Sequence, residues 1–212
     1  MVDPEAGHDP TKSEEATGSG RGSVLRYFNI PIYSKKLTFM LDLSGGMDRP
    51  LDGQGADGPP RIMIAKEELK KTVEALPGDT EVNVLFFASA YYAAAPRLVP
   101  VGKMRQKLVQ YVDQQQIPTE RHTNRGNIFC TLRLALTQPA IDTVFMLSEG
   151  NPTEGQYIDL KRFLRHLTIL NRYCKTRIHA LFIGSAKSAE RYLQAVAVEG
   201  GGGKFYDVKQ IR

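Results

Sequence analysis

Four short runs of almost continuous apolar residues recur along the chain, at residues 36–43, 81–88, 142–148 and 177–184. Each run has the length of a β-strand, and apolar residues without alternation are typical of strands buried on both faces of a parallel sheet. The segments between the runs carry hydrophobic residues three and four positions apart, as amphipathic helices require. This alternation predicts a Rossmann-like, doubly wound α/β fold, with a mostly parallel central sheet and helices on both faces.

Five segments show the helical spacing: residues 61–76, 102–114, 127–138, 157–174 and 188–200. The first segment has one apolar stripe, made of Ile62, Ala65, Leu69, Val73 and Leu76. The fourth has another, made of Leu160, Phe163, Leu164, Leu167 and Leu170. We expect both helices to bury these stripes on the sheet. Residues 204–211 are predicted to form a last strand at the sheet's edge, and the Gly- and Pro-rich residues 47–60 a surface loop.

The N-terminal residues 1–23 lack the apolar content that an ordered segment needs, so we predict a disordered tail followed by one domain at 24–212. Of the net charge of +5, the acidic residues 1–22 contribute −3, which leaves the remainder basic. The basic residues are spread over several predicted helical faces without interleaved aromatics, which argues against a nucleic-acid partner. Six of them lie on or just after one long helix, at Lys161, Arg162, Arg165, Arg172, Lys175 and Arg177, where we expect a solvated face.

No segment has the apolar length of a membrane span or the pattern of a signal peptide, so the sequence favours a cytoplasmic protein without membrane insertion. Cys130 and Cys174 both sit in apolar patterns, where we expect them to pack as small hydrophobic residues.

Polar residues follow two of the predicted strands at their carboxyl ends. Asp42 and Ser44 end the first strand, and Glu149 follows the third, within "SEGNPTEG". Because loops at the carboxyl ends of parallel strands converge, we expect Asp42, Ser44 and Glu149 to lie together; this group is called the rim below.

The motifs resemble the von Willebrand factor A (VWA) family, and bacterial members in particular. The resemblance spans residues 34–212 and rests on "LDLSGG" after the first strand and "SEGNPTEG" after the third predicted strand. Further cues agree in order: "FF" before Ala88, "NIF" at residue 127 and the closing "GGGGKFYDV". It implies the doubly wound fold and a protein-binding role. It also implies a metal-ion-dependent adhesion site, in which an aspartate and two hydroxyls of the first loop, a threonine of the second and an aspartate of the third hold a divalent cation, usually Mg²⁺.

The chain departs from that pattern at three of the five positions. Gly46 stands in place of the second serine, Gly126 in place of the threonine, and Glu149 in place of the third-loop aspartate. The resemblance therefore implies a degenerate site held by Asp42, Ser44 and Glu149, with Thr123 as a further ligand if the second loop is longer than usual. Since Mg²⁺ requires near-octahedral oxygen ligation, either a loosened Mg²⁺ site or a vestigial one is consistent with these residues.

Without a metal, Asp42 has another use, because it can accept hydrogen bonds from loop N–H groups or from an arginine such as Arg125. His122 adds an imidazole that could complete a transition-metal set with Asp42 and Glu149, although a lone loop histidine is more often solvated. Ser44 lacks the Gly-x-Ser-x-Gly frame of a hydrolase nucleophile.

These features favour a protein-interaction module over an enzyme. The alternative from another class is a metal-dependent hydrolase or phosphotransfer enzyme that uses the same rim. A third is a scaffold domain whose helices bind neighbours within a larger multidomain assembly.

Overall fold

The computed structural model describes residues 24–211, so the predicted disordered tail at 1–23 lies outside the described part. A seven-stranded sheet forms the centre, in the order β5-β4-β3-β7-β8-β9, with β6 also paired to β4. Its parallel strands are β3 (Lys36–Asp42), β4 (Glu81–Phe87), β7 (Thr143–Ser148), β8 (Arg177–Phe182) and β9 (Phe205–Asp207). The predicted doubly wound α/β fold is confirmed.

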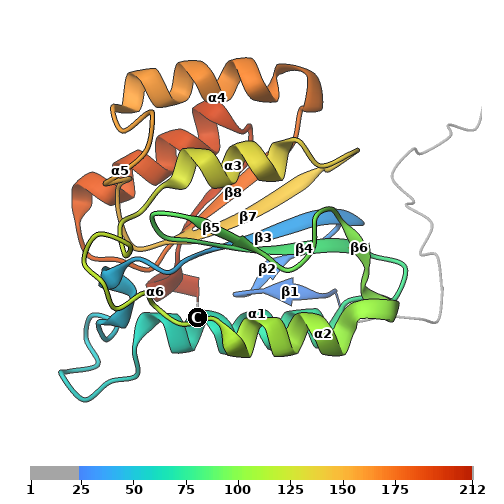
Figure 1. Ribbon diagram of the computed structural model, residues 1–212, viewed down its shortest axis with the longest axis horizontal. Coiled ribbons are helices and arrows are strands. Elements are labelled where there is room, and N and C mark those ends of the chain that lie inside the picture. Colours follow the sequence, from blue (N-terminus) through green and yellow to red (C-terminus); the bar gives the residue numbers. More distant parts are fainter. Residues whose placement is uncertain (1–23, 212) are drawn as a thin grey trace, which may run out of the picture.

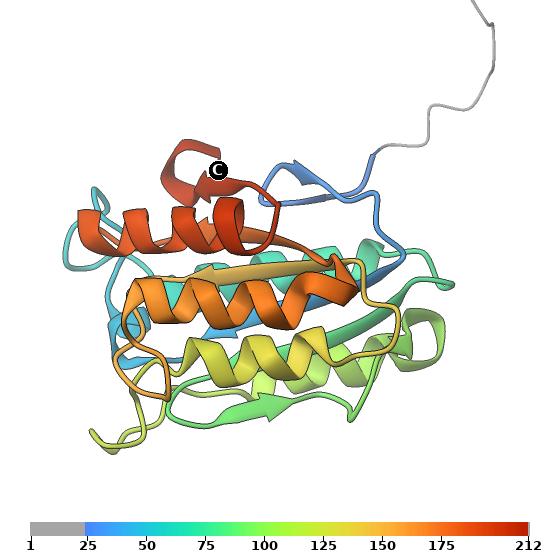
Figure 2. The same ribbon diagram turned by 90° about the horizontal axis from the view of Figure 1, so that it is seen from above.

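Helices cover both faces of the sheet (Figure 1). On one face lie α1 (Arg61–Ala75) and α2 (Val101–Gln114). On the other lie α3 (Ile128–Leu136), α4 (Leu160–Cys174) and α5 (Lys187–Ala195), which run side by side in Figure 2. Each face has its own hydrophobic core, because the continuous apolar strands send side chains to both sides. The whole predicted stripe of α1 is buried; in the stripe of α4, Phe163 and Leu167 are buried and the other three residues pack half-buried against the core.

Several short elements have no apolar run and were not predicted. β1 (Arg26–Tyr27) and β2 (Ile30–Pro31) form a small antiparallel hairpin, and β5 (Tyr91–Ala93) and β6 (Val99–Pro100) pair antiparallel with β4. The hairpin closes the core on the α1 side, where Tyr27 is fully buried with its ring 5.0 Å from that of Phe39.

Three predictions need correction. The last segment is only partly a strand, because β9 ends at Asp207 and a short helix α6 (Val208–Ile211) follows, with Val208 buried in the core. The predicted loop at 47–60 is shorter, since a 3₁₀ helix η1 (Gly45–Asp48) precedes it. Cys174, the last residue of α4, is exposed rather than packed, although its Sγ lies 3.3 Å from the carbonyl of Leu136.

The helix predicted at 188–200 continues from α5 through one π-helical turn, η2 (Val196–Gly200). Among residues 24–211, no helix combines the length and the apolar content needed to cross a bilayer.

Candidate functional site at the carboxyl ends of the strands

Asp42 is the last residue of β3 and is almost completely buried. One carboxylate oxygen accepts a hydrogen bond from the backbone N–H of Ser44 at 2.7 Å, and the other from the hydroxyl of Ser148 at 2.6 Å. Burial raises the pKa of Asp42, while the hydrogen bonds from Ser148 and Ser44 oppose that rise. The buried acid is therefore held by donors from the first loop and from the last residue of β7.

Glu149 follows β7 and places its carboxylate directly over Gly46. A Cβ added at Gly46 would lie 2.0 Å from one carboxylate oxygen of Glu149 and 2.7 Å from the other. The Glu149 side chain therefore fills the space in which a serine side chain at position 46 would stand. Burial and the nearby Asp42 charge raise the pKa of Glu149, while Arg61 and Arg49 oppose that rise.

Arg61, the first residue of α1, supplies the positive charge of the site. Its side chain is only 4% exposed, and its guanidinium lies 3.2 Å from Glu149 Oε2 and 3.2 Å from Asp52 Oδ1. The same group donates to the carbonyl of Gly46 at 3.3 Å. Asp52 also faces Lys209 of α6, at 3.6 Å. Arg61 thus joins the first loop, the loop before α1 and the end of β7.

The second loop contributes little to this network. The hydroxyl of Thr123 donates to the carbonyl of Glu120 at 2.8 Å, within its own turn. Gly126 is buried, and its N–H donates to the hydroxyl of Thr153 at 3.0 Å. Arg125 is exposed, and its backbone N–H bonds the Ser89 hydroxyl at 3.3 Å. The imidazole of His122 is 77% exposed and pairs with Glu120.

The structure therefore brings Asp42, Ser44 and Glu149 together but leaves His122 in solvent. Arg61 was not among the predicted site residues, although the sequence carries one signal for it. It is the first residue of a helix, and the next residue, Ile62, belongs to the buried stripe, which indicates a buried position for Arg61 as well.

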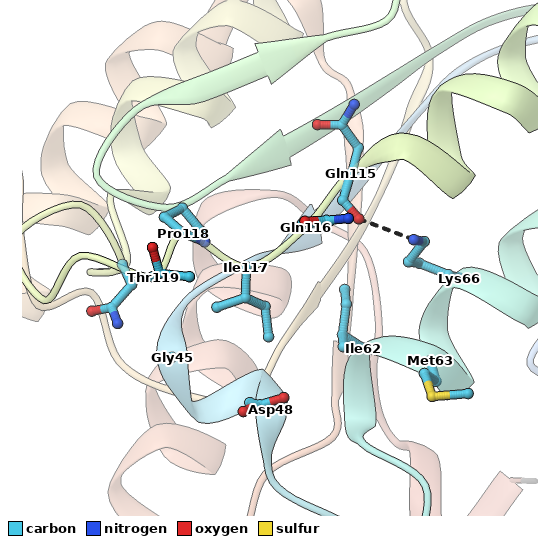
Figure 3. Close-up of a pocket in the computed structure, with 11 residues that line it drawn as sticks. Gly45, Asp48, Ile62, Met63, Lys66, Gln115, Gln116, Ile117, Pro118 and Thr119 are labelled. Carbon is cyan, nitrogen blue, oxygen red and sulfur yellow. Dashed lines mark hydrogen bonds between the residues drawn. The ribbon is translucent and has the colours of Figure 1, made fainter.

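An open groove of about 520 Å³ is lined in part by Gly45, the residue after Ser44 of the rim (Figure 3). Its walls come from η1, from the first turns of α1 and from the segment after α2, and they include Asp48, Ile62, Met63, Ile117, Pro118 and Asn124. Lys66 fixes one wall, because its ammonium donates to the backbone carbonyls of Asp113 and Gln115 at 2.9 and 3.0 Å. We call this hollow the rim groove. It offers both apolar carbon and hydrogen-bonding groups to a ligand.

Solved structures with the same arrangement of strands and helices were found by comparison. The D319A mutant of the PilB minor pilin from Streptococcus sanguinis superposes with a TM-score of 0.63 at 13% identity, over 84% of this chain and 58% of that one. A von Willebrand factor type A protein from Catenulispora acidiphila superposes with a TM-score of 0.57 at 15% identity, over 84% of this chain and 40% of that one. BatB from Bacteroides thetaiotaomicron superposes with a TM-score of 0.56 at 14% identity, over 81% of this chain and 88% of that one.

The chain has the von Willebrand factor A fold. No family model and no curated protein sequence matches it, so the likeness lies in the structure and not in the sequence as a whole. The chain spans a little under three-fifths of the pilin's length. One further structure of the same fold, proximal thread matrix protein 1 of the mussel byssus, has a MIDAS motif occupied by zinc, at 11% identity and a TM-score of 0.56 over 84% of this chain and 45% of that one.

Proposed function

We propose that this chain is a protein-binding module of VWA type, and that its partner docks at the rim groove. The observation that carries the proposal is an exposed apolar side chain beside a hollow at the carboxyl end of the sheet. Met63 is 50% exposed at the groove wall, next to Ile62 and Ile117. Ligands of open α/β sheets bind at this end, and methionine adapts its shape to different partners.

The hydrogen bonds of the rim favour binding over catalysis. A hydrolase would need a base free to take a proton and a nucleophile beside it. Here both carboxylate oxygens of Asp42 already accept hydrogen bonds, and the hydroxyl of Ser148 donates to Asp42 instead of to a histidine. Glu149 is paired with Arg61. Within residues 24–211, no three His, Cys, Asp or Glu side chains are grouped to hold a metal ion.

The fold neighbours give this proposal indirect support. One is a minor pilin and another a matrix protein of a thread, and both names denote components of multi-protein material. We infer that the present chain likewise recognises a neighbouring protein, within a larger assembly.

A pair of matched surface variants tests the docking face. Met63→Arg places a charge at the rim groove, and Ile169→Arg places the same charge on α4, where Ile169 is 58% exposed. Both side chains lie in solvent, so both variants should fold. A partner selected with the wild-type chain should bind Ile169→Arg unchanged and Met63→Arg with a Kd raised about tenfold or more, as measured by calorimetry. Equal binding to both variants, or loss only with Ile169→Arg, would contradict docking at the rim groove.

A further inference from the structure

The residues at the rim do not fit a magnesium ion. Mg²⁺ demands six oxygens at about 2.1 Å in near-octahedral geometry. Of the hydroxyl positions of the adhesion-site pattern, two are Gly46 and Gly126, and the Thr123 hydroxyl is bonded within its own turn. Glu149, the second acid, turns its carboxylate toward Arg61. What remains at Asp42 is a carboxylate whose two oxygens are already bonded to Ser44 and Ser148.

We propose that the guanidinium of Arg61 is a built-in cation that holds the rim together in place of a divalent metal ion. The inference stands apart from the proposed function, because it concerns the charge balance of the isolated chain. It predicts a rim that is assembled at all times and does not respond to magnesium.

The geometry of Arg61 suits that role. Two acids, Glu149 and Asp52, lie 3.2 Å from the guanidinium, and the charge of Asp42 acts on Glu149. A guanidinium presents five donors in a fixed fork and stays charged at every physiological pH. One guanidinium can therefore contact two carboxylates and a carbonyl at once, and so bring oxygen atoms together as a bound cation would. Two other basic residues lie near these acids, and each affects one acid. The charge of Arg49 acts on Glu149, and the ammonium of Lys209 lies 3.6 Å from Asp52.

Two features of the chain place Arg61 where a metal would be needed. Gly46 has no side chain, which leaves room for the Glu149 carboxylate to approach the guanidinium. The loop before α1 returns to η1, where the backbone N–H of Arg61 donates to the carbonyl of Arg49 at 2.9 Å. Gly46, Glu149 and Arg61 therefore act together. Gly46 and Glu149 are two of the three departures from the adhesion-site pattern, and the position of Arg61 accounts for both.

The test removes the built-in cation and asks whether a metal replaces it. Arg61→Met keeps most of the side-chain length and removes the charge. We expect the wild-type chain to melt at the same temperature in EDTA and in millimolar magnesium, manganese or calcium chloride. We expect Arg61→Met to melt lower in EDTA and to recover at least about 3 °C in calcium chloride, because Ca²⁺ accepts irregular oxygen coordination and a cation that binds only the folded state raises Tm.

Arg105→Met is the matched control. Arg105 donates to three backbone carbonyls, those of Val73, Glu74 and Leu76, and makes no ion pair with a carboxylate of residues 24–211. Its variant should be destabilised without any recovery in the metal salts. A wild-type Tm that rises with metal would overturn the proposal, and so would an Arg61→Met variant that recovers no more than Arg105→Met.

A double variant keeps the proposal testable if Arg61→Met does not fold in EDTA. Adding Glu149→Gln removes the more buried of the two acids that Arg61 contacts, so the double variant should fold and should not respond to metal. A double variant that is no more stable than Arg61→Met would show that Arg61 acts through packing instead of charge.

Discussion

Gly46→Ala should displace the Glu149 carboxylate from Arg61. The added Cβ would lie 2.0 Å and 2.7 Å from the two carboxylate oxygens, well inside van der Waals contact. The atoms in the way are the far end of a flexible side chain, so Glu149 should rotate aside while the backbone stays in place. The ion pair of 3.2 Å between Arg61 and Glu149 would then be lost.

The size of the effect follows from the burial of the two partners. Removing one partner of a fully buried ion pair costs about 3–5 kcal/mol. Here the Glu149 side chain is 25% exposed and regains water when it turns aside, and Arg61 keeps Asp52 and the Gly46 carbonyl. We therefore expect the free energy of unfolding to fall by about 1–3 kcal/mol.

Urea unfolding followed by circular dichroism measures this change. Gly150→Ala is the control, because nothing lies within 4 Å of a Cβ added there; it should change the free energy of unfolding by less than about 0.5 kcal/mol. In a Glu149→Ala background the Gly46→Ala substitution should have little further effect, since the carboxylate is already gone. An equal loss of stability in both backgrounds would refute the reasoning, because the effect would then come from the backbone at Gly46 and not from the ion pair.

Three further predictions concern the core, the rim and one helix start. Phe145→Ala should lower the free energy of unfolding by about 3–5 kcal/mol in urea, because this ring is 2% exposed and stacks on Phe39 in the middle of the sheet; a loss below about 1 kcal/mol would show that β7 is not central. Burial raises the pKa of Asp42, so the folded chain binds a proton at this carboxyl group more tightly than the unfolded chain does. The protonated carboxyl group therefore contributes stability below pH 3.8, and this stability is lost as the pH rises through the folded pKa. Wild-type stability relative to Asp42→Asn should therefore fall as the pH is raised above 3.8 and then level off in urea titrations, and a relative stability that rises with pH would contradict this. Asn127→Ala should lower stability by about 1 kcal/mol, since the Asn127 side chain accepts from the N–H of Cys130 at the start of α3; an unchanged unfolding midpoint in urea would show that this cap is dispensable.

The sequence by itself determined the central strands, the covering helices and the ends where polar residues collect. Continuous apolar runs of strand length must be buried on both faces, and the apolar stripe of a helix such as α1 must pack on another surface. Strands and helices of these kinds in alternation are compatible with few folds. Asp42 and Glu149 could be placed at one edge for the same reason, because parallel strands bring their carboxyl ends together. Each of these inferences uses only short-range periodicity and the direction of the chain.

Only the tertiary structure decided which cation faces those acids. Asp42 was expected to find a loop N–H group or an arginine such as Arg125, and the N–H group of Ser44 was found; the arginine of the site is Arg61, which pairs with Glu149 from 88 residues away in the chain. That pairing depends on the free space above Gly46 and on the path of the loop before α1, neither of which leaves a periodic pattern. The short strands β1, β2, β5 and β6 escaped prediction for the same physical reason: two or three residues form a strand only because a neighbouring strand offers them hydrogen bonds.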